Sequence, residues 1–321
     1  MIIDPHVHVL DKGHWPKEWW DWVARDWANR VPGRKPEDIV EKAEENLLDP
    51  DGGRLISQMD SAGVDVSVIL PIDWGVDYHA ARTLDEINQH AEAVARLHSD
   101  RLIAFAGIDP RREGASDKLE RWLSGSFKGL KLYPSTGFYP ASAEAFALYE
   151  VCAARDMPVL FHTGDPLPVM DKEYARPKHF AAVTKAFPRL KIFLAHCGYG
   201  QTDEWNDALE VAAQSERACL ELSVLLWDDS TEEKEVELVR KIDQARNRVG
   251  IERILFGTDH VSGKKIRPPG FLDKVVSMFR RLPDTARKAG VSITAAEHDK
   301  IMGGNVQQLI NVDWSRFRQT S

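Results

Sequence analysis

Two histidines near the amino terminus, His6 and His8, carry imidazole side chains that can bind a metal ion, and they stand two residues apart in the chain. They end the stretch Ile2-Ile3-Asp4-Pro5-His6-Val7-His8, which starts like a short, apolar β-strand. Because side chains alternate across a strand, residues two apart point to the same side. The pair could therefore chelate a divalent metal ion, but two surface imidazoles at this spacing would look the same.

Three later strand-like runs, over residues 159–162, 192–196 and 254–259, end in His162, His196 and Asp259. Imidazole and carboxylate ligands suit Zn²⁺, with Mn²⁺ or Fe²⁺ also possible. Such an ion polarises a carbonyl oxygen and lowers the pKa of bound water, and both effects favour hydrolysis. The chemistry also needs a proton shuttle, for which His196 and Asp259 are the candidates.

The elements that must position these residues alternate regularly between strands and helices. The predicted strands are 2–8, 66–71, 102–108, 129–133, 159–162, 192–196, 218–222 and 254–259. The predicted helices are 54–62, 80–98, 117–123, 143–155, 179–187, 204–214 and 233–248, and then 271–281, 295–302 and 306–310 in a C-terminal helical tail.

This order predicts an α/β fold, a (β/α)₈ TIM barrel that forms a single domain over residues 1–321. The sequence contains neither a GxGxxG nor a Walker A motif, so nothing indicates a nucleotide-binding open sheet instead. In a parallel barrel all the strands end on one face, where active sites of this fold are built. His6, His8, His162, His196 and Asp259 can therefore surround one point.

A tryptophan-rich insertion, about residues 11–50, is predicted to follow the first strand and fold over the barrel mouth. It contains Trp15, Trp19, Trp20, Trp22 and Trp27, which do not keep to one helical face. These rings could simply cover apolar surface at the barrel end. Alternatively, they could form an aromatic wall over a substrate.

The composition is that of an ordinary soluble globular protein, with 43% hydrophobic and 29% charged residues. A net charge of −8 without a basic run predicts no nucleic-acid partner and no attraction to anionic membranes. The absence of a long apolar run or a leader-like start, and three cysteines without metal or redox spacing, predict a cytoplasmic protein without disulfides.

Taken together, the motifs resemble the amidohydrolase superfamily, and within it the branch that includes aminocarboxymuconate-semialdehyde decarboxylase. They are Asp4-Pro5-His6-Val7-His8, Phe161-His162-Thr163-Gly164, Ala195-His196-Cys197-Gly198, Phe256-Gly257-Thr258-Asp259 and Gly304-Asn305-Val306. The resemblance implies that His6, His8, His162 and Asp259 bind one metal ion, usually zinc, and that His196 is an acid/base beside it. It also implies a possible homodimer.

Other residues near the strand ends are candidates for substrate binding. Trp74 and Tyr133 follow the second and fourth strands, and Arg176 follows the fifth, where it could hold a carboxylate or merely start a helix. Lys131 stands where binuclear members of the superfamily carry a carbamylated lysine between two metals, but the favoured interpretation is a free ammonium that pairs with a carboxylate or binds substrate. His260 follows Asp259 and could act near the site or only pack.

Three functions remain open at this point. The leading hypothesis is a metal-dependent hydrolase that uses metal-activated water on a small cyclic ester or amide, with or without an aromatic ring. The alternative is a nonoxidative decarboxylase of an aromatic or unsaturated carboxylic acid, which would need a cationic partner such as Arg176. The third is a catalytically silent barrel that acts as a binding module.

Overall fold

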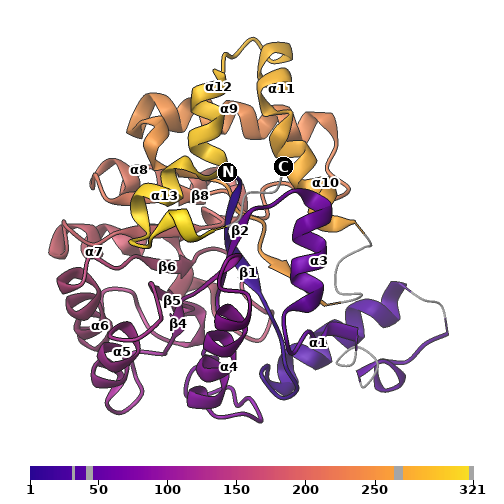
Figure 1. Ribbon diagram of the computed structural model, residues 1–321, viewed down its shortest axis with the longest axis vertical. Coiled ribbons are helices and arrows are strands. Elements are labelled where there is room, and N and C mark those ends of the chain that lie inside the picture. The colour runs from indigo at the N-terminus through magenta and orange to yellow at the C-terminus, as the bar shows by residue number, and fades with distance from the viewer. Residues whose placement is uncertain (31–32, 41–45, 264–269, 318–321) are drawn as a thin grey trace.

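The computed structural model describes residues 1–30, 33–40, 46–263 and 270–317. Its parallel strands lie inside a layer of helices (Figure 1). The strands are β1 (Ile3–His8), β2 (Val66–Ile69), β3 (Leu102–Ala104), β4 (Ala106–Gly107), β5 (Leu130–Leu132), β6 (Val159–His162), β7 (Ile192–Ala195), β8 (Ala218–Glu221), β9 (Ile254–Leu255) and β10 (His260–Val261).

These strands close into the predicted (β/α)₈ barrel. They pair in the orders β10-β1-β2-β3 and β4-β5-β6-β7-β8-β9. The third predicted strand is divided into β3 and β4 at Phe105. The eighth, predicted over 254–259, is shorter in the structure as β9, and β10 follows just after its predicted end. The ring closes where β10 pairs in parallel with β1, with Val7 opposite His260.

The helices of the outer layer follow the strands in the expected alternation. They are α1 (Lys17–Arg30), α3 (Gly53–Ala62), α4 (Leu84–Leu97), α5 (Ala115–Leu123), α6 (Ala143–Ala154), α7 (Phe180–Ala186), α8 (Thr202–Ala213), α9 (Glu232–Val249), α10 (Phe271–Arg280), α11 (Leu282–Lys288), α12 (Ala295–Asp299) and α13 (Asn305–Leu309). Within the part of the chain that the structure describes, no helix is long and apolar enough to cross a membrane.

Helix α11 is an element that the sequence analysis missed. Its Pro283 stands in the first helical turn, where a residue without an N–H group leaves no hydrogen bond unmade. The sequence analysis predicts a helix over 271–281 and no further helix before residue 295. The Leu282-Pro283 pair instead starts a new helix after α10 ends at Arg280.

Two apolar cores hold the barrel together. One lies between the strands and the surrounding helices, and a second, smaller one is formed by side chains such as Val66, Ile103 and Phe193. The C-terminal segment contributes Val306 and Ile310 to the smaller core. The tail is therefore part of the fold rather than an appendage.

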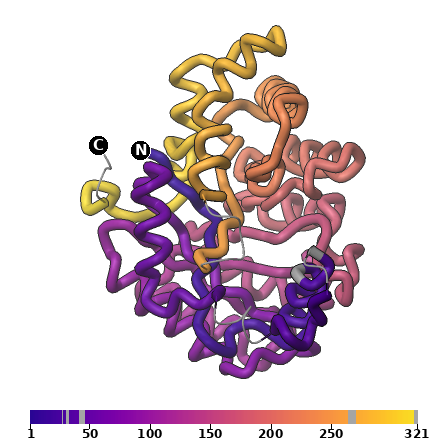
Figure 2. The backbone as a smooth tube through the Cα atoms, turned by 90° about the vertical axis from the view of Figure 1, so that its right-hand side faces the viewer, coloured from indigo at the N-terminus to yellow at the C-terminus, as the bar shows by residue number. Residues whose placement is uncertain are grey.

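The tryptophan-rich segment forms helix α1, which lies at the opposite end of the molecule from α11 and α12 in both views (Figures 1 and 2). Trp15, Trp19 and Trp20 are buried in a third apolar cluster, which they share with Trp74 and Tyr133. Trp22 is exposed. The side chain of Trp27 lies outside the described part of the structure.

Candidate active site

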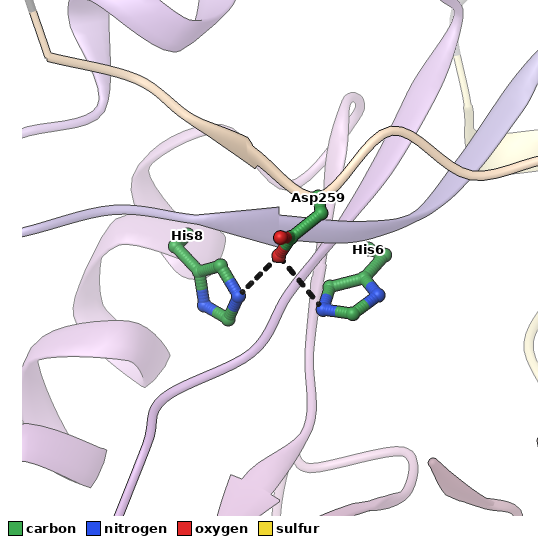
Figure 3. Close-up of side chains that lie close together, drawn as sticks. All are labelled: His6, His8 and Asp259. Carbon is green, nitrogen blue, oxygen red and sulfur yellow. Dashed lines mark hydrogen bonds and ion pairs between the residues drawn. The ribbon is translucent and has the colours of Figure 1, made fainter. Parts of the chain in front are cut away.

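His6, His8 and Asp259 come together at the end of the first strand (Figure 3). Asp259 Oδ1 lies 3.2 Å from His6 Nε2 and 3.1 Å from His8 Nε2. His8 Nδ1 donates a hydrogen bond to the Leu70 carbonyl oxygen at 2.7 Å, because that oxygen can only accept. The lone pair of His8 is therefore on Nε2, the nitrogen that faces the carboxylate.

His162 lines the same cavity from the end of β6 but does not belong to this close group. Its ring centre lies 4.9 Å from that of His196 and 4.4 Å from that of Tyr133. A hydrogen bond with the backbone of Asp165 restrains the ring, while the buried Nε2 has no hydrogen-bond partner among the residues that the structure describes. This nitrogen is available to an ion or a substrate.

His196 lies beside His6, with the two ring centres 5.0 Å apart. Its Nδ1 is 2.8 Å from Ser223 Oγ, and that hydroxyl lies 2.7 Å from Glu221 Oε2. Glu221 Oε2 is also 3.2 Å from His6 Nδ1. One buried carboxyl group thus connects, directly or through a hydroxyl, to both imidazoles.

The sequence analysis did not identify Glu221 and Ser223 as functional residues. A signal was present, since Glu221 is the one charged residue in the apolar strand Ala218-Cys219-Leu220-Glu221-Leu222. A charged residue is seldom fully buried without a partner. Glu221 is completely buried, and burial raises its pKa to about 8 against the opposing hydrogen bonds from Ser223.

The electrostatics of the cavity set which groups carry charge. Burial lowers the pKa of His196 to about 4, although Asp259 opposes this shift, so the imidazole is neutral at pH 7. Burial acts to raise the pKa of Asp259, but His6 and His8 hold it well below its ordinary value. Asp259 is therefore ionised and can serve as a ligand or a base.

Lys131 extends from β5 into this group, with Nζ 3.4 Å from His6 Nε2. Burial lowers the pKa of the ammonium to about 8, while the charges of Asp259 and Glu221 act to raise it. The amine is thus largely protonated at neutral pH. This places a cation in the cavity, next to the group formed by His6, His8 and Asp259.

The cavity above these groups has a volume of about 400 Å³ and an aromatic wall. Its aromatic lining residues, besides the histidines, are Trp15, Trp19, Trp22, Trp74, Tyr133, Tyr199 and Trp227. Trp15 packs edge-on against Trp74, and Trp74 against Tyr133. The indole Nε1 of Trp74 is buried and has no hydrogen-bond partner within the described part of the chain.

The structure does not bring Arg176 or His260 into this cavity. Arg176 follows a short 3-10 turn and pairs with Glu173 at 3.3 Å, so this loop lines the cavity with Asp165 to Pro168 instead. His260 points to the other side of β10 from Val261, as alternation along a strand requires. Its ring stacks on Phe271, and its Nε2 is 2.9 Å from Gln58 Oε1.

Backbone strain is concentrated at the same end of the barrel. Non-glycine residues with positive φ in the described ranges are Asp156, His196, Cys197, Tyr199, Val224 and Asp259. All of these except Asp156 lie at or just after the ends of β7, β8 and β9. Such conformations cost roughly 1–3 kcal/mol each and tend to persist at functional sites.

The sequence profile of the amidohydrolase family matches residues 3–310. The chain belongs to the amidohydrolase family. This confirms the resemblance drawn from the strand-end motifs. The comparison with curated proteins gave no match.

Solved structures resemble this amidohydrolase over nearly their whole length. An uncharacterised TIM-barrel protein from Bordetella bronchiseptica is 20% identical, with a TM-score of 0.64 and coverage of 96% of this chain and 97% of the other. A dihydroxybenzoic acid decarboxylase from Polaromonas sp. JS666, with bound manganese and the inhibitor 2-nitroresorcinol, is 19% identical, with a TM-score of 0.59 and 96% coverage of both chains. A probable 2-pyrone-4,6-dicarboxylic acid hydrolase from Acinetobacter baumannii is 11% identical, with a TM-score of 0.61 and coverage of 96% and 98%. At these identities the likeness supports the barrel fold.

The residues at the barrel mouth fit a divalent metal ion. The donor atoms of His6, His8 and Asp259 lie within 4.8 Å of one another, and two imidazoles with a carboxylate are ordinary zinc ligands. The buried, unpartnered Nε2 of His162 offers a further donor at the same cavity. A second group, His6, His196 and Glu221, also meets the distance condition, but the protein's own hydrogen bonds already link its members.

Proposed function

We propose that this amidohydrolase is a metal-dependent hydrolase of a small, planar cyclic ester or amide. The observation that carries the proposal is the neutral, buried imidazole of His196 beside the donor set of His6, His8 and Asp259 in one cavity. Hydrolysis requires a base that removes a proton from water as it attacks. A neutral imidazole at this position can do so at physiological pH.

A zinc ion or another divalent ion bound to His6, His8 and Asp259 would polarise a carbonyl oxygen and make water more acidic. The protein's residues would carry out the proton transfers. His196 or Asp259 takes a proton from water as the water oxygen forms a bond to the carbonyl carbon. The ring C–O or C–N bond then breaks, and the proton passes to the leaving oxygen or nitrogen.

Lys131 and the aromatic wall would bind and orient the substrate. The Lys131 ammonium stabilises negative charge on the carbonyl oxygen, or pairs with a carboxylate substituent. The rings of Trp15, Trp74 and Tyr133 favour a flat, apolar substrate body. The unpartnered Trp74 Nε1–H would donate to a substrate oxygen, because a buried donor without an acceptor is costly.

Nonoxidative decarboxylation of an aromatic acid is the second candidate. It is supported by the dihydroxybenzoic acid decarboxylase among the structural neighbours and by Lys131, which could hold a carboxylate. Against it, the guanidinium expected to bind that carboxylate, Arg176, pairs with Glu173 outside the cavity. Within the described ranges, no arginine lines the cavity.

A substrate panel with two separate readouts tests these alternatives. Protein loaded with Zn²⁺ or Mn²⁺ would be assayed on 2-pyrone-4,6-dicarboxylate, other lactones, cyclic amides and dihydroxybenzoates, with ring opening followed by absorbance and CO₂ by gas analysis. Ring opening that is lost in His196→Gln supports the hydrolase. CO₂ release would overturn it in favour of the lyase, and metal-free, inactive protein would indicate a silent barrel.

A further inference from the structure

We infer that Glu221 and Ser223 are positioning residues that fix the tautomers of two neighbouring imidazoles. In these tautomers His6 serves as a metal ligand and His196 as a base. This inference rests on the proposed function for the base role of His196. Both residues lie at the end of β8, one residue apart, and both are completely buried. Neither contacts the open part of the cavity.

The hydrogen-bond pattern fixes which ring nitrogens carry protons. Lys131 Nζ lies 3.4 Å from His6 Nε2, and an ammonium can only donate, so this ring nitrogen is the acceptor. His6 Nδ1 therefore donates to Glu221 Oε2 over 3.2 Å, which leaves the lone pair of His6 on Nε2. That is the nitrogen 3.2 Å from Asp259 Oδ1, so His6 faces the donor group with a ligating atom.

Ser223 determines in the same way which ring nitrogen of His196 carries the proton. Its hydroxyl has one proton, which it donates to Glu221 Oε2 over 2.7 Å, so its oxygen must accept from His196 Nδ1 over 2.8 Å. The lone pair of His196 is consequently on Nε2. An imidazole held in this tautomer can take a proton from water without first having to lose one of its own.

The backbone around Glu221 is shaped to keep this carboxyl group in place. Its Oε1 accepts from the Ser223 backbone N–H at 2.9 Å, which orients the two residues toward each other. On the neighbouring strand, Gly257 leaves the space that the carboxyl group occupies, since a Cβ there would lie 1.6 Å from Glu221 Oε1. Removing hydrogen-bond partners of metal-bound histidines typically costs 10–100-fold in metal affinity.

Metal affinity tests the first half of the inference without any substrate. Chelator-treated protein would be titrated with Zn²⁺ by calorimetry in competition with a chelator. Glu221→Ala should bind Zn²⁺ about 10–100-fold more weakly than the wild type, and Glu221→Gln, which keeps an acceptor for His6 Nδ1, should lose less. Glu235→Gln is the matched control, since Glu235 is also buried but bonds to Arg281, just before α11, and to Thr285 on α11. Equal Zn²⁺ affinity for Glu221→Ala and the wild type would overturn the role of Glu221.

The tautomer of His196 tests the second half. NMR of zinc-loaded protein with ¹⁵N-labelled histidine should show His196 protonated on Nδ1 and unprotonated on Nε2, with the signal assigned through His196→Gln. Ser223→Ala should shift this signal toward the other tautomer with unchanged zinc affinity, and Ser223→Thr, which restores a hydroxyl, should recover it. An unchanged tautomer in folded Ser223→Ala would contradict the inference. If the tautomers behave as stated but no lactone or amide is turned over, the proposed function fails and the positioning role stands.

Discussion

At the scale of single residues, the account depends on the three donor atoms that meet at the end of β1. Asp259 approaches both histidines to within 3.2 Å, yet it comes from the far end of the sequence. Its backbone φ is +55°, an unfavourable conformation for a residue with a Cβ. The fold therefore maintains a strained residue among the three proposed metal ligands.

Replacing Asp259 by asparagine should weaken metal binding more than replacing a hydrogen-bond partner of a metal ligand does. The neutral amide removes the one carboxylate of the donor set, so we expect the affinity for Zn²⁺ to fall by at least about 100-fold, beyond the range for hydrogen-bond partners of ligands. Calorimetric titration of chelator-treated protein measures this. Asp165→Asn, at the same cavity but paired with Lys172, is the control and should bind like the wild type.

Trp74 is a residue whose indole N–H is expected to recognise the substrate. Trp74→Phe keeps an aromatic ring but removes the donor, so the loss is about one hydrogen bond, or roughly 1 kcal/mol. For a substrate with an acceptor oxygen on its ring, KM should rise about 5-fold. Trp22→Phe, at the exposed edge of the same cavity, should leave KM unchanged. Equal KM values for the wild type and Trp74→Phe would show that this donor does not contact the substrate.

At the scale of elements, the strand ends were predictable and the direction of several side chains was not. Apolar runs that stop at His162, His196 and Asp259 are visible in the sequence, and a parallel barrel gathers their ends. Arg176 looked equally suitable, but its place depends on how a loop folds and on its pairing with Glu173. The direction of His260 was not predictable either, since the left-handed backbone of Asp259 interrupts the alternation of an extended strand.

Glu221 shows what the sequence could not supply. The apolar strand 218–222 predicts a buried position, but a partner for the carboxyl group has to come from other strands. The partner is His6, which lies 215 residues away in the chain, and the space is provided by Gly257 on the next strand. Such contacts follow from the barrel's three-dimensional packing rather than from local pattern.

The segment before helix α1 should make the stability of the protein depend on pH through His14. This histidine is buried, accepts a hydrogen bond from the Asp11 backbone N–H and lies against His90, whose ring centre is 4.6 Å away. Burial and the neighbouring His90 lower the pKa of His14 to about 4 from an ordinary value of 6.5. The other charged groups that influence it are Asp11, Arg82 and Glu86.

Because the folded state has the lower pKa, the unfolded state binds the proton first as the pH falls. The stability that neutral His14 contributes is complete above pH 6.5 and is lost between about pH 6.5 and 4, on the order of 2 kcal/mol. Urea unfolding across this range should show a shallower pH dependence for His14→Gln than for the wild type. Parallel curves for the two proteins would contradict this origin of acid sensitivity.

At the scale of the whole molecule, the barrel mouth brings together side chains from the first strand and from a segment much later in the sequence. The ring closes between β1 and β10, and the proposed ion site lies across that closure, with His6 and His8 on one side and Asp259 on the other. An ion bound there would connect the first strand to the last. Metal binding and global stability are therefore expected to be linked.

Removal of the ion should lower the melting temperature. A ligand present at 100 times its Kd stabilises the folded state by about 2.7 kcal/mol. For a protein of this size that corresponds to a Tm higher by a few degrees, lost on adding EDTA. Scanning calorimetry with and without Zn²⁺ measures the shift, and Asp259→Asn should melt at the same temperature in both conditions. A wild type insensitive to EDTA and Zn²⁺ would argue against an ion that bridges the closure.

The central claim is that side chains from the first and last strands hold one divalent ion at the mouth of this barrel. Anomalous diffraction from crystals grown with Zn²⁺, collected on both sides of the zinc absorption edge, tests it most directly. The account predicts one strong peak between His6 Nε2, His8 Nε2 and Asp259 Oδ1. A cavity without a peak at full zinc loading, or a peak ligated by other residues, would contradict it.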